Sequence, residues 1–239
     1  MTEKLFRTDA YLKTAVGRVT RLSQGGVVLD SSVFYAQGGG QPGDAGRLSW
    51  DKGEMAVSVA VNGEGDDIVL QAADGAVMPE VGTQVTQTLD WDRRYTHMRI
   101  HTALHLLSVA VPLPVTGGSI SAEKGRLDFD MPEPVDKDEL TQKMNEMIAL
   151  DLPVTDSWIT DEELLANPGL VKTMSVQPPI GAGRVRLVRI GEGDRQIDLQ
   201  PCGGTHVART SEIGPVRIGK IEKKGRQNRR VNLFLGAEA

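Results

Sequence analysis

The chain has 239 residues, of which 25% are charged and 39% hydrophobic, and its formal net charge at pH 7 is −5. We expect a soluble globular protein with one large domain or two small ones, and the spread of charge excludes the run of about 20 apolar residues that a membrane helix needs. The single cysteine excludes an internal disulfide. Because the start of the chain also lacks the apolar core of a secretory signal, we expect a reducing, cytoplasmic location.

The first ninety residues are expected to be β structure. Short runs rich in Val, Leu and Ile over residues 16–33 and 55–70 are separated by turn signals such as Gly25-Gly26 and residues 62–66. This pattern predicts a small antiparallel β-barrel domain over residues 1–90. Residues 38–46 form an unusual loop within it, because five of these nine residues are glycine.

The glycine-rich loop has two interpretations. Backbone N–H groups that carry no side chains can cradle an anion, whereas a strained hairpin explains the same composition. Gln41 and Pro42 follow the glycines where a Walker loop would have Gly-Lys-Ser/Thr. We therefore expect no site for a nucleoside triphosphate.

From about Asp90 the pattern changes to that of a second domain, which we expect over residues 91–239. Apolar residues at helical spacing predict helices over residues 91–110, 137–150 and 161–165. The predicted strands cover residues 125–130, 184–190, 194–199, 214–222 and 230–235. Because helices and strands do not alternate strictly, the predicted fold class is α+β, with helices packed on an antiparallel sheet.

The scarce histidines and the cysteine are grouped. His101 and His105 are four residues apart in the predicted helix, so their rings project from one face. Cys202 and His206 lie on either side of two glycines and a threonine, which allow a tight turn. Three imidazoles and one thiolate are a donor set that suits one Zn²⁺ per chain.

Spacing leaves the role of such a metal open. Four protein ligands would close the site and make it structural, whereas catalysis needs an exchangeable position. Thr102 stands where a protease of the His-Glu-x-x-His type has its catalytic glutamate, so proteolysis is disfavoured. His97, one helical turn before His101, is interpreted as a helix-surface residue.

A basic segment lies near the end of the chain. Between Arg217 and Arg230 there are seven basic residues and one acidic residue, so the local charge is +6 and the remainder carries −11. A solvated hairpin explains such a run, but the contrast favours a surface for a polyanion, held through salt-dependent phosphate contacts. The candidate phosphate contacts are Arg93, Arg94, Lys220, Lys223, Lys224, Arg226, Arg229 and Arg230.

Four segments occur in the order found in the editing domain of alanyl-tRNA synthetase: residues 34–46, 99–107, 202–207 and 213–218. On these motifs the chain resembles the free-standing alanyl-tRNA editing proteins called AlaX, in the longer form that has a glycine-rich N-terminal domain. The resemblance implies a zinc-dependent hydrolase that deacylates mischarged tRNA(Ala) in trans and without ATP. The implied substrates are chiefly Ser-tRNA(Ala), with Gly-tRNA(Ala) second, and the implied zinc ligands are His101, His105, Cys202 and His206.

The resemblance also implies residues near the substrate. The glycine-rich motif, which takes part in substrate discrimination, corresponds to Gly38, Gly39, Gly40, Gln41, Pro42 and Asp44. Thr116 and then Ser119 are the nearest matches to a hydroxyl residue that selects the amino acid. Because an apolar pocket discriminates poorly against one added hydroxyl, Thr116 and Gln41 are candidate partners for serine. Asp128 is a candidate general base.

The implied partner is the acceptor end of tRNA(Ala), met by a monomer. Two alternatives stay open at this point. One is a non-catalytic, zinc-stabilised RNA-binding module, in which four protein ligands close the metal site. The other is a zinc hydrolase of small esters, for which the basic segment would be incidental.

Overall fold

The computed structural model describes residues 1–173 and 183–236. The chain forms two compact units, Met1–His97 and Met98–Ala239, and the boundary between them falls inside helix α1 (Trp91–Ala110). Within the described residues, no helix combines the length and the apolar character that crossing a membrane requires.

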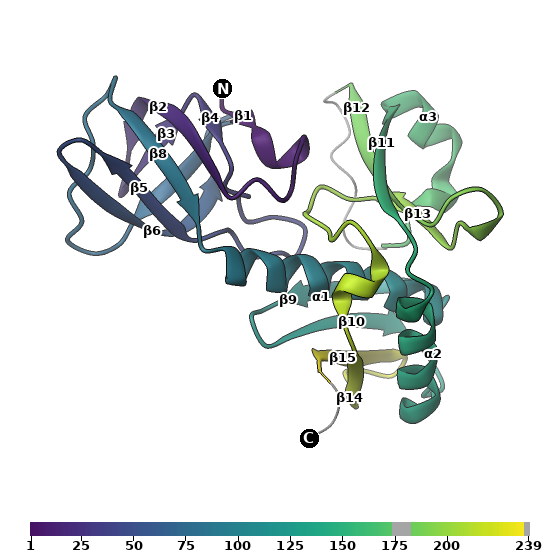
Figure 1. Cartoon of the computed structure of the whole chain (residues 1–239). Helices are drawn as coiled ribbons and strands as arrows, with labels where there is room; N and C mark the ends of the chain where they lie inside the picture. The colour runs from purple at the N-terminus through teal and green to yellow at the C-terminus, as the bar shows by residue number, and fades with distance from the viewer. Residues whose placement is uncertain (174–182, 237–239) are drawn as a thin grey trace. The chain divides into compact units, whose positions relative to one another are not determined.

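The first unit contains a closed antiparallel barrel (Figure 1). Around the barrel the strands follow the order β2 (Thr14–Ser23), β3 (Gly26–Leu29), β7 (Ile68–Ala72), β6 (Gly53–Asn62), β5 (Gly46–Trp50) and β8 (Gln84–Leu89). Pairing of β8 with β2 closes the ring and removes its exposed edges. Outside it, β1 (Glu3–Lys4) pairs in parallel with β4 (Ser31–Ser32), and the 3₁₀ turn η1 (Leu5–Arg7) follows β1. The predicted N-terminal barrel is confirmed.

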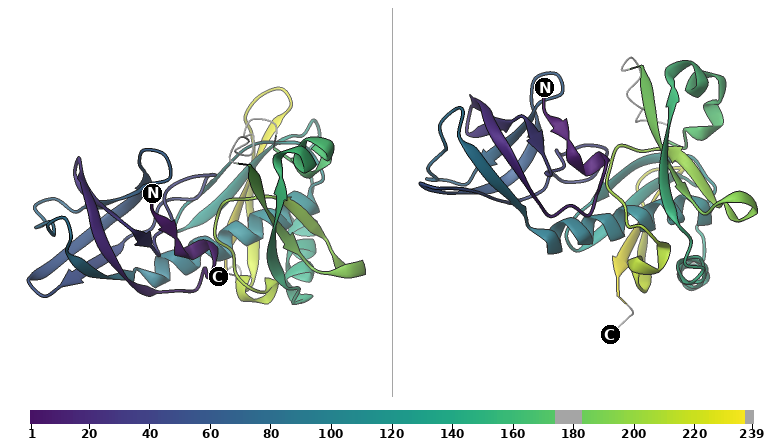
Figure 2. Two further views of the ribbon diagram at one scale, coloured as in Figure 1. Left: turned by 90° about the horizontal axis from the view of Figure 1, so that it is seen from above. Right: turned by 45° about the horizontal axis from the view of Figure 1, so that its top comes forward.

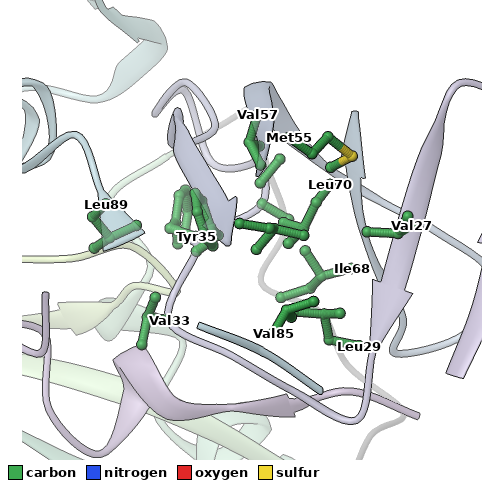
Figure 3. Packing of buried hydrophobic residues seen from close by; sticks show 14 of the residues in the cluster. Val27, Leu29, Val33, Tyr35, Met55, Val57, Ile68, Leu70, Val85 and Leu89 are labelled. Atoms are coloured by element: carbon green, nitrogen blue, oxygen red, sulfur yellow. The ribbon is translucent and has the colours of Figure 1, made fainter. Parts of the chain in front are cut away.

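Alternating apolar side chains fill the barrel (Figure 3). In β6, Met55 and Val57 are buried while their neighbours along the strand are exposed, and in β7 Ile68 and Leu70 face the same interior. Full burial of each such side chain is worth roughly 1.5–3 kcal/mol. The barrel core therefore follows directly from the period-two apolar pattern of the sequence.

The glycine-rich segment forms a tight turn held by the backbone. Gly38 and Gln41 exchange two backbone hydrogen bonds of 3.1 and 2.9 Å around Gly39 and Gly40, whose φ angles of 56° and 82° suit a two-residue hairpin turn. Further along, a Cβ atom on Gly43 would lie 1.9 Å from the carbonyl oxygen of Ala60 in β6. Turn geometry and close packing thus account for the glycines in this segment.

Arg94 fixes the end of this segment within the first unit. Its Nε donates to Asp44 Oδ2 at 2.9 Å, and its two terminal nitrogens donate to the carbonyl oxygens of Ala10 and Val33 at 3.0 and 2.6 Å. The same Asp44 carboxylate accepts from the backbone N–H of Tyr35 at 2.6 Å. The Arg94 side chain is completely buried. The prediction that Arg94 contacts phosphate is therefore wrong, because its donors are directed at partners inside the protein.

The second unit contains two antiparallel sheets (Figure 2). One has the strand order β14 (Val216–Lys223), β15 (Asn228–Leu235), β10 (Lys124–Asp130) and β9 (Val115–Ile120), and the other β11 (Val154–Thr160), β12 (Arg184–Ile190) and β13 (Asp198–Pro201). Helix α2 (Lys137–Ala149) packs beside β14, and α3 (Asp161–Ala166) beside β11 and β12. The 3₁₀ turns are η2 (Pro168–Leu170), η3 (Gly193–Arg195) and η4 (Thr210–Ile213). The predicted α+β class is confirmed.

Three elements of the second unit differ from prediction. Strand β9 was not among the predicted strands, yet it pairs with β10 along its length. Strand β11 has no buried alternation to reveal it, since its residues are mostly exposed, and pairing with β12 defines it. The strand predicted over residues 194–199 is wrong in its first half, where η3 turns the chain before β13 begins.

Replacing Arg94 by Met is expected to lower the free energy of unfolding by about 3–5 kcal/mol, because it leaves the Asp44 carboxylate buried without its cation. Urea unfolding followed by circular dichroism measures the change. The matched control is Arg47→Met, since Arg47 and Glu54 form an ion pair in which both side chains are more than half exposed. The control should cost less than about 1 kcal/mol, and equal losses in both variants would contradict the assigned role of Arg94.

Candidate functional site

Helix α1 presents two imidazoles to one point of the second unit. His101 and His105 are 7% and 6% exposed, and their ring centroids are 5.4 Å apart. The helix is buried on several sides here, with Ile100 and Leu104 both inside the unit. Its rigid backbone therefore sets the separation of the two rings.

The segment after β13 brings two more donors to the same point. The Sγ atom of Cys202 lies 3.4 Å from Nε2 of His101 and 3.3 Å from Nε2 of His206. Arg186 of β12 donates from Nη1 to the carbonyl oxygens of Cys202 and Gly204, at 3.1 and 2.9 Å, and so holds the turn that carries the donors. One ligand atom from each of His101, His105, Cys202 and His206 lies within 4.8 Å of all the others.

The electrostatics of this cluster favour the ligating forms of Cys202 and His206 and the protonated form of His105. Burial alone would raise the pKa of the Cys202 thiol, but the adjacent His101 and His206 outweigh it and hold that pKa well below its usual range. Burial, together with His101, lowers the pKa of His206 to about 3. Burial also opposes the charge on His105, yet hydrogen bonds to Asp198 and Cys202 raise its pKa to about 9. A metal bound at the inner nitrogens would compete with that proton for the cluster.

The donor set fits a zinc ion. Zn²⁺ takes four nitrogen and sulfur ligands in tetrahedral structural sites, and Cys-His₃ belongs to the same chemistry as the known Cys₃His and Cys₂His₂ sets. The mutual spacing of the four ligand atoms is that of donors around one centre. The residues predicted as metal ligands from their spacing are thus brought together by the fold.

Asp128, the candidate base, is engaged elsewhere. Its carboxylate pairs with Arg126 at 2.6 Å and with Arg230 at 2.8 Å. Burial would raise the pKa of Asp128, but hydrogen bonds from these two guanidinium groups outweigh it and keep the pKa below its ordinary value. A carboxylate held in this way accepts a proton poorly, so the structure speaks against Asp128 as a general base.

The other single candidates are spread over both units. In the second unit, Thr116 accepts a hydrogen bond of 3.0 Å from Asn228 Nδ2, and Ser119 lies on β9 opposite β10. In the first unit, Gln41 is 1% exposed. Arg93 is half-buried and donates to a backbone carbonyl of the glycine-rich segment at 3.4 Å.

Strands β14 and β15 form the basic hairpin, and several of its cations have partners within the unit. Lys224 pairs with Glu222 at 2.6 Å, and Arg229 donates to the carbonyl oxygen of Pro132. Arg230 is held by an ion pair as described above. Three further cations are exposed and have no ion pair in the described part of the chain: Lys220, Lys223 and Arg226.

Sequence reasoning missed the groups behind the cluster. Asp198 Oδ2 lies 3.0 Å from His105 Nδ1, and Thr102 Oγ1 lies 3.1 Å from His206 Nδ1. A signal for Asp198 was present, because residues 198, 200 and 202 share one side of an extended strand. The hydroxyl of Thr102 carried no such signal, since its partner is 104 residues away in the sequence.

His97 was predicted to lie on the helix surface, and that prediction is wrong. Its side chain is 1% exposed, and Nδ1 has no hydrogen-bond partner among the described residues. Burial, followed by the nearby Arg93 guanidinium, lowers the pKa of His97 to about 4. His97 is thus held neutral at pH 7.

Comparison with known proteins identifies the class. A family model described as the second additional domain of threonyl and alanyl tRNA synthetases matches residues 185–232, and a model of class II (A) tRNA synthetases matches residues 6–93. Alanine–tRNA ligase of Pyrobaculum calidifontis is 36% identical over 93% of this chain, which covers 25% of that enzyme. The barrel and the His/Cys cluster therefore belong to a protein related to the alanyl-tRNA synthetases.

Smaller relatives match along their whole length. The alanyl-tRNA editing protein AlaX-M of Saccharolobus solfataricus is 37% identical, over 97% of this chain and 98% of that protein. The protein of the same name from Methanosarcina mazei is 34% identical, over 98% and 97%. The chain belongs to the AlaX-M family of alanyl-tRNA editing proteins, and the resemblance predicted from four motifs is confirmed.

The buried His97 predicts a pH dependence of stability. The unfolded chain binds a proton at His97 near pH 6.5, whereas the folded protein binds it only near pH 4. The contribution of neutral His97 to the free energy of unfolding is therefore complete above about pH 6.5. It falls by about 2 kcal/mol between pH 7.5 and pH 5. Urea unfolding of the wild type and of His97→Gln at both pH values, with a chelator present, should give a smaller loss in the variant. Parallel losses in the two proteins would contradict the neutral, buried state of His97.

Proposed function

We propose that this chain is a zinc-dependent deacylase that acts in trans on mischarged tRNA(Ala). Its substrate is chiefly Ser-tRNA(Ala), with Gly-tRNA(Ala) second, and the bond hydrolysed is the ester between the amino acid and the terminal ribose. The observation that carries the proposal is the convergence of three imidazoles and one thiol, in a chain that covers nearly the full length of its AlaX-M relatives.

The residues that would hold the zinc are His101, His105, Cys202 and His206. When bound there, Zn²⁺ supplies polarisation of the ester carbonyl or acidification of a water. Because four protein ligands complete a tetrahedral site, turnover requires that one position be exchangeable or that substrate add to it. A single-ligand variant that keeps its fold by circular dichroism but loses activity indicates this catalytic role, whereas one that unfolds indicates a structural role.

Polar groups of the chain and of the substrate orient the attacking water, and polar side chains select the amino acid that is removed. Since Asp128 is paired with two arginines, we assign no side chain as the base, and backbone groups and the substrate's own ribose hydroxyl orient the attacking water. Acceptance of serine over alanine requires a polar partner for the extra hydroxyl. Thr116 is our first candidate for that contact, and Gln41 and Ser119 are the others.

The exposed cations of the β14–β15 hairpin supply the proposed surface for the tRNA backbone. Phosphate contacts of this kind fix the register of the acceptor end without reading its sequence. We propose a cytoplasmic monomer that needs no ATP, because ester hydrolysis is downhill without it.

The direct test is release of serine from Ser-tRNA(Ala), and of alanine from Ala-tRNA(Ala), by the purified protein. We expect serine release to exceed alanine release, and His101→Ala and Cys202→Ala to lose at least about 100-fold, because catalysis by a bound metal contributes several kcal/mol. His97→Gln is the matched control, since it alters a histidine of the same helix outside the cluster, and it should stay within a few-fold of the wild type.

Two outcomes would reject this function. If the folded, zinc-loaded protein releases serine no faster than buffer does but still binds tRNA, the chain is a non-catalytic RNA-binding module. If it cleaves small seryl esters as fast as Ser-tRNA(Ala), the assignment of tRNA as the substrate is wrong.

The hairpin surface predicts a salt dependence of tRNA binding. The affinity should fall linearly with salt on a double-logarithmic plot, and the triple variant Lys220→Gln, Lys223→Gln, Arg226→Gln should reduce the slope by about 2, since each lost phosphate contact removes roughly 0.7–0.9. Filter binding from low to physiological salt measures both slopes. Lys52→Gln, an exposed cation of the barrel, is the control, and an unchanged slope in the triple variant would remove the hairpin from the interface.

A further inference from the structure

The outer nitrogen of His105 is held by a buried carboxylate. Nδ1 of His105 lies 3.0 Å from Oδ2 of Asp198, which is 3% exposed. An ionised carboxylate can only accept a hydrogen bond, so Nδ1 must carry the proton. When a metal displaces the second proton of this imidazole, Nε2 is then the nitrogen that offers its lone pair beside the other three donors.

The outer nitrogen of His206 is held by a hydroxyl. Thr102 donates its single hydroxyl proton to the carbonyl oxygen of Met98, four residues earlier, at 2.9 Å. Its oxygen must therefore accept at its other contacts, which are the backbone N–H of Val207 at 3.3 Å and Nδ1 of His206 at 3.1 Å. His206 also has its proton on Nδ1, and its Nε2 faces Cys202.

Asp198 is itself fixed from both of its oxygens. The ammonium group of Lys172 pairs with Oδ1, and the side-chain amide of Gln200 donates to Oδ2 at 2.8 Å. The same Gln200 amide reaches Ser108 Oγ at 3.3 Å, and Ser108 in turn donates to the carbonyl oxygen of His105 at 2.8 Å. This arrangement leaves the carboxylate one orientation, aimed at the imidazole.

We propose that Asp198 and Thr102 are positioning residues of the metal site, which fix the tautomer and ring orientation of His105 and His206, and that Lys172 anchors Asp198. The inference rests on the proposed metal site, and it adds residues that touch neither the metal nor the substrate. Outer hydrogen-bond partners of ligating histidines commonly contribute 10–100-fold in metal affinity. Thr102 occupies the position at which a protease of the His-Glu-x-x-His type has its catalytic glutamate. In this chain that residue instead holds the zinc ligand His206.

The test measures metal binding without tRNA. Zn²⁺ affinity is determined by competition with a chromophoric chelator, and Co²⁺ is used as a second probe, whose absorption bands report the number and type of ligands. We expect Asp198→Ala and Asp198→Asn to weaken Zn²⁺ binding by 10–100-fold and Lys172→Met by several-fold. Thr102→Val should weaken it by about 10-fold, whereas Thr102→Ser, which keeps the hydroxyl, should stay within about threefold of the wild type.

Matched controls separate positioning from a general loss of packing. Thr141 of α2 donates to the carbonyl oxygen of Lys137 and accepts from the N–H of Ile218, so it makes the same two kinds of backbone contact as Thr102 with no imidazole. Thr141→Val should leave Zn²⁺ affinity unchanged, as should Asp151→Asn, whose carboxylate is held by Arg209 and Ser211.

The two sets of outcomes are distinct. Zn²⁺ affinities within twofold of the wild type in Thr102→Val and in Asp198→Asn overturn the proposal, and so does an equal loss in Thr102→Val and Thr102→Ser. Folding of each variant is judged by circular dichroism of the metal-free protein. If a variant does not fold, the test uses Lys172→Met, which is expected to lose Zn²⁺ affinity, and Thr102→Ser, which is expected to retain it. If the wild type binds Zn²⁺ tightly but releases no serine, the proposed function fails while the positioning roles stand.

Discussion

Three buried imidazoles and one half-buried cysteine that meet at a single point are the constraint on which the second unit depends. Polar groups removed from water destabilise a fold unless partners are supplied for them. Here the outer nitrogens of His105 and His206 meet Asp198 and Thr102, and Arg186 holds the backbone of the turn that carries Cys202. The inner atoms are left facing one another, which is the arrangement that a metal stabilises and that a fold without one would avoid.

A second buried charge has a different consequence in the first unit. Arg94 and Asp44 satisfy each other and three backbone groups around the glycine-rich segment. The conformation of that segment is therefore set by its own unit, through a turn that needs positive φ and a close approach that leaves no room for a side chain. Glycine content that suggested an anion cradle is explained here by backbone geometry.

In the basic hairpin, a count of charges does not show which basic side chains are available to contact phosphate. Some of its cations form ion pairs within the unit, such as Arg230 with Asp128. Others are exposed to solvent, such as Lys220 and Arg226. Surface cations without partners are the ones that can exchange counterions for phosphate at little cost. Asp128 forms ion pairs with two arginines, Arg126 and Arg230, so its carboxylate stabilises the sheet rather than acting as a base.

The sequence by itself determined the barrel, helices α1 and α2, and the pairing of two His/Cys segments, because each depends on local periodicity or on a spacing of four residues. It did not determine β11, whose residues carry no buried pattern and which exists through its pairing with β12. Nor did it decide that Arg94 and His97 are buried or that Thr102 hydrogen-bonds to His206. These features depend on contacts between residues far apart in the chain. Only the tertiary structure chooses among the partners that a charged or polar side chain could take, because that choice is made by which groups are excluded from water together.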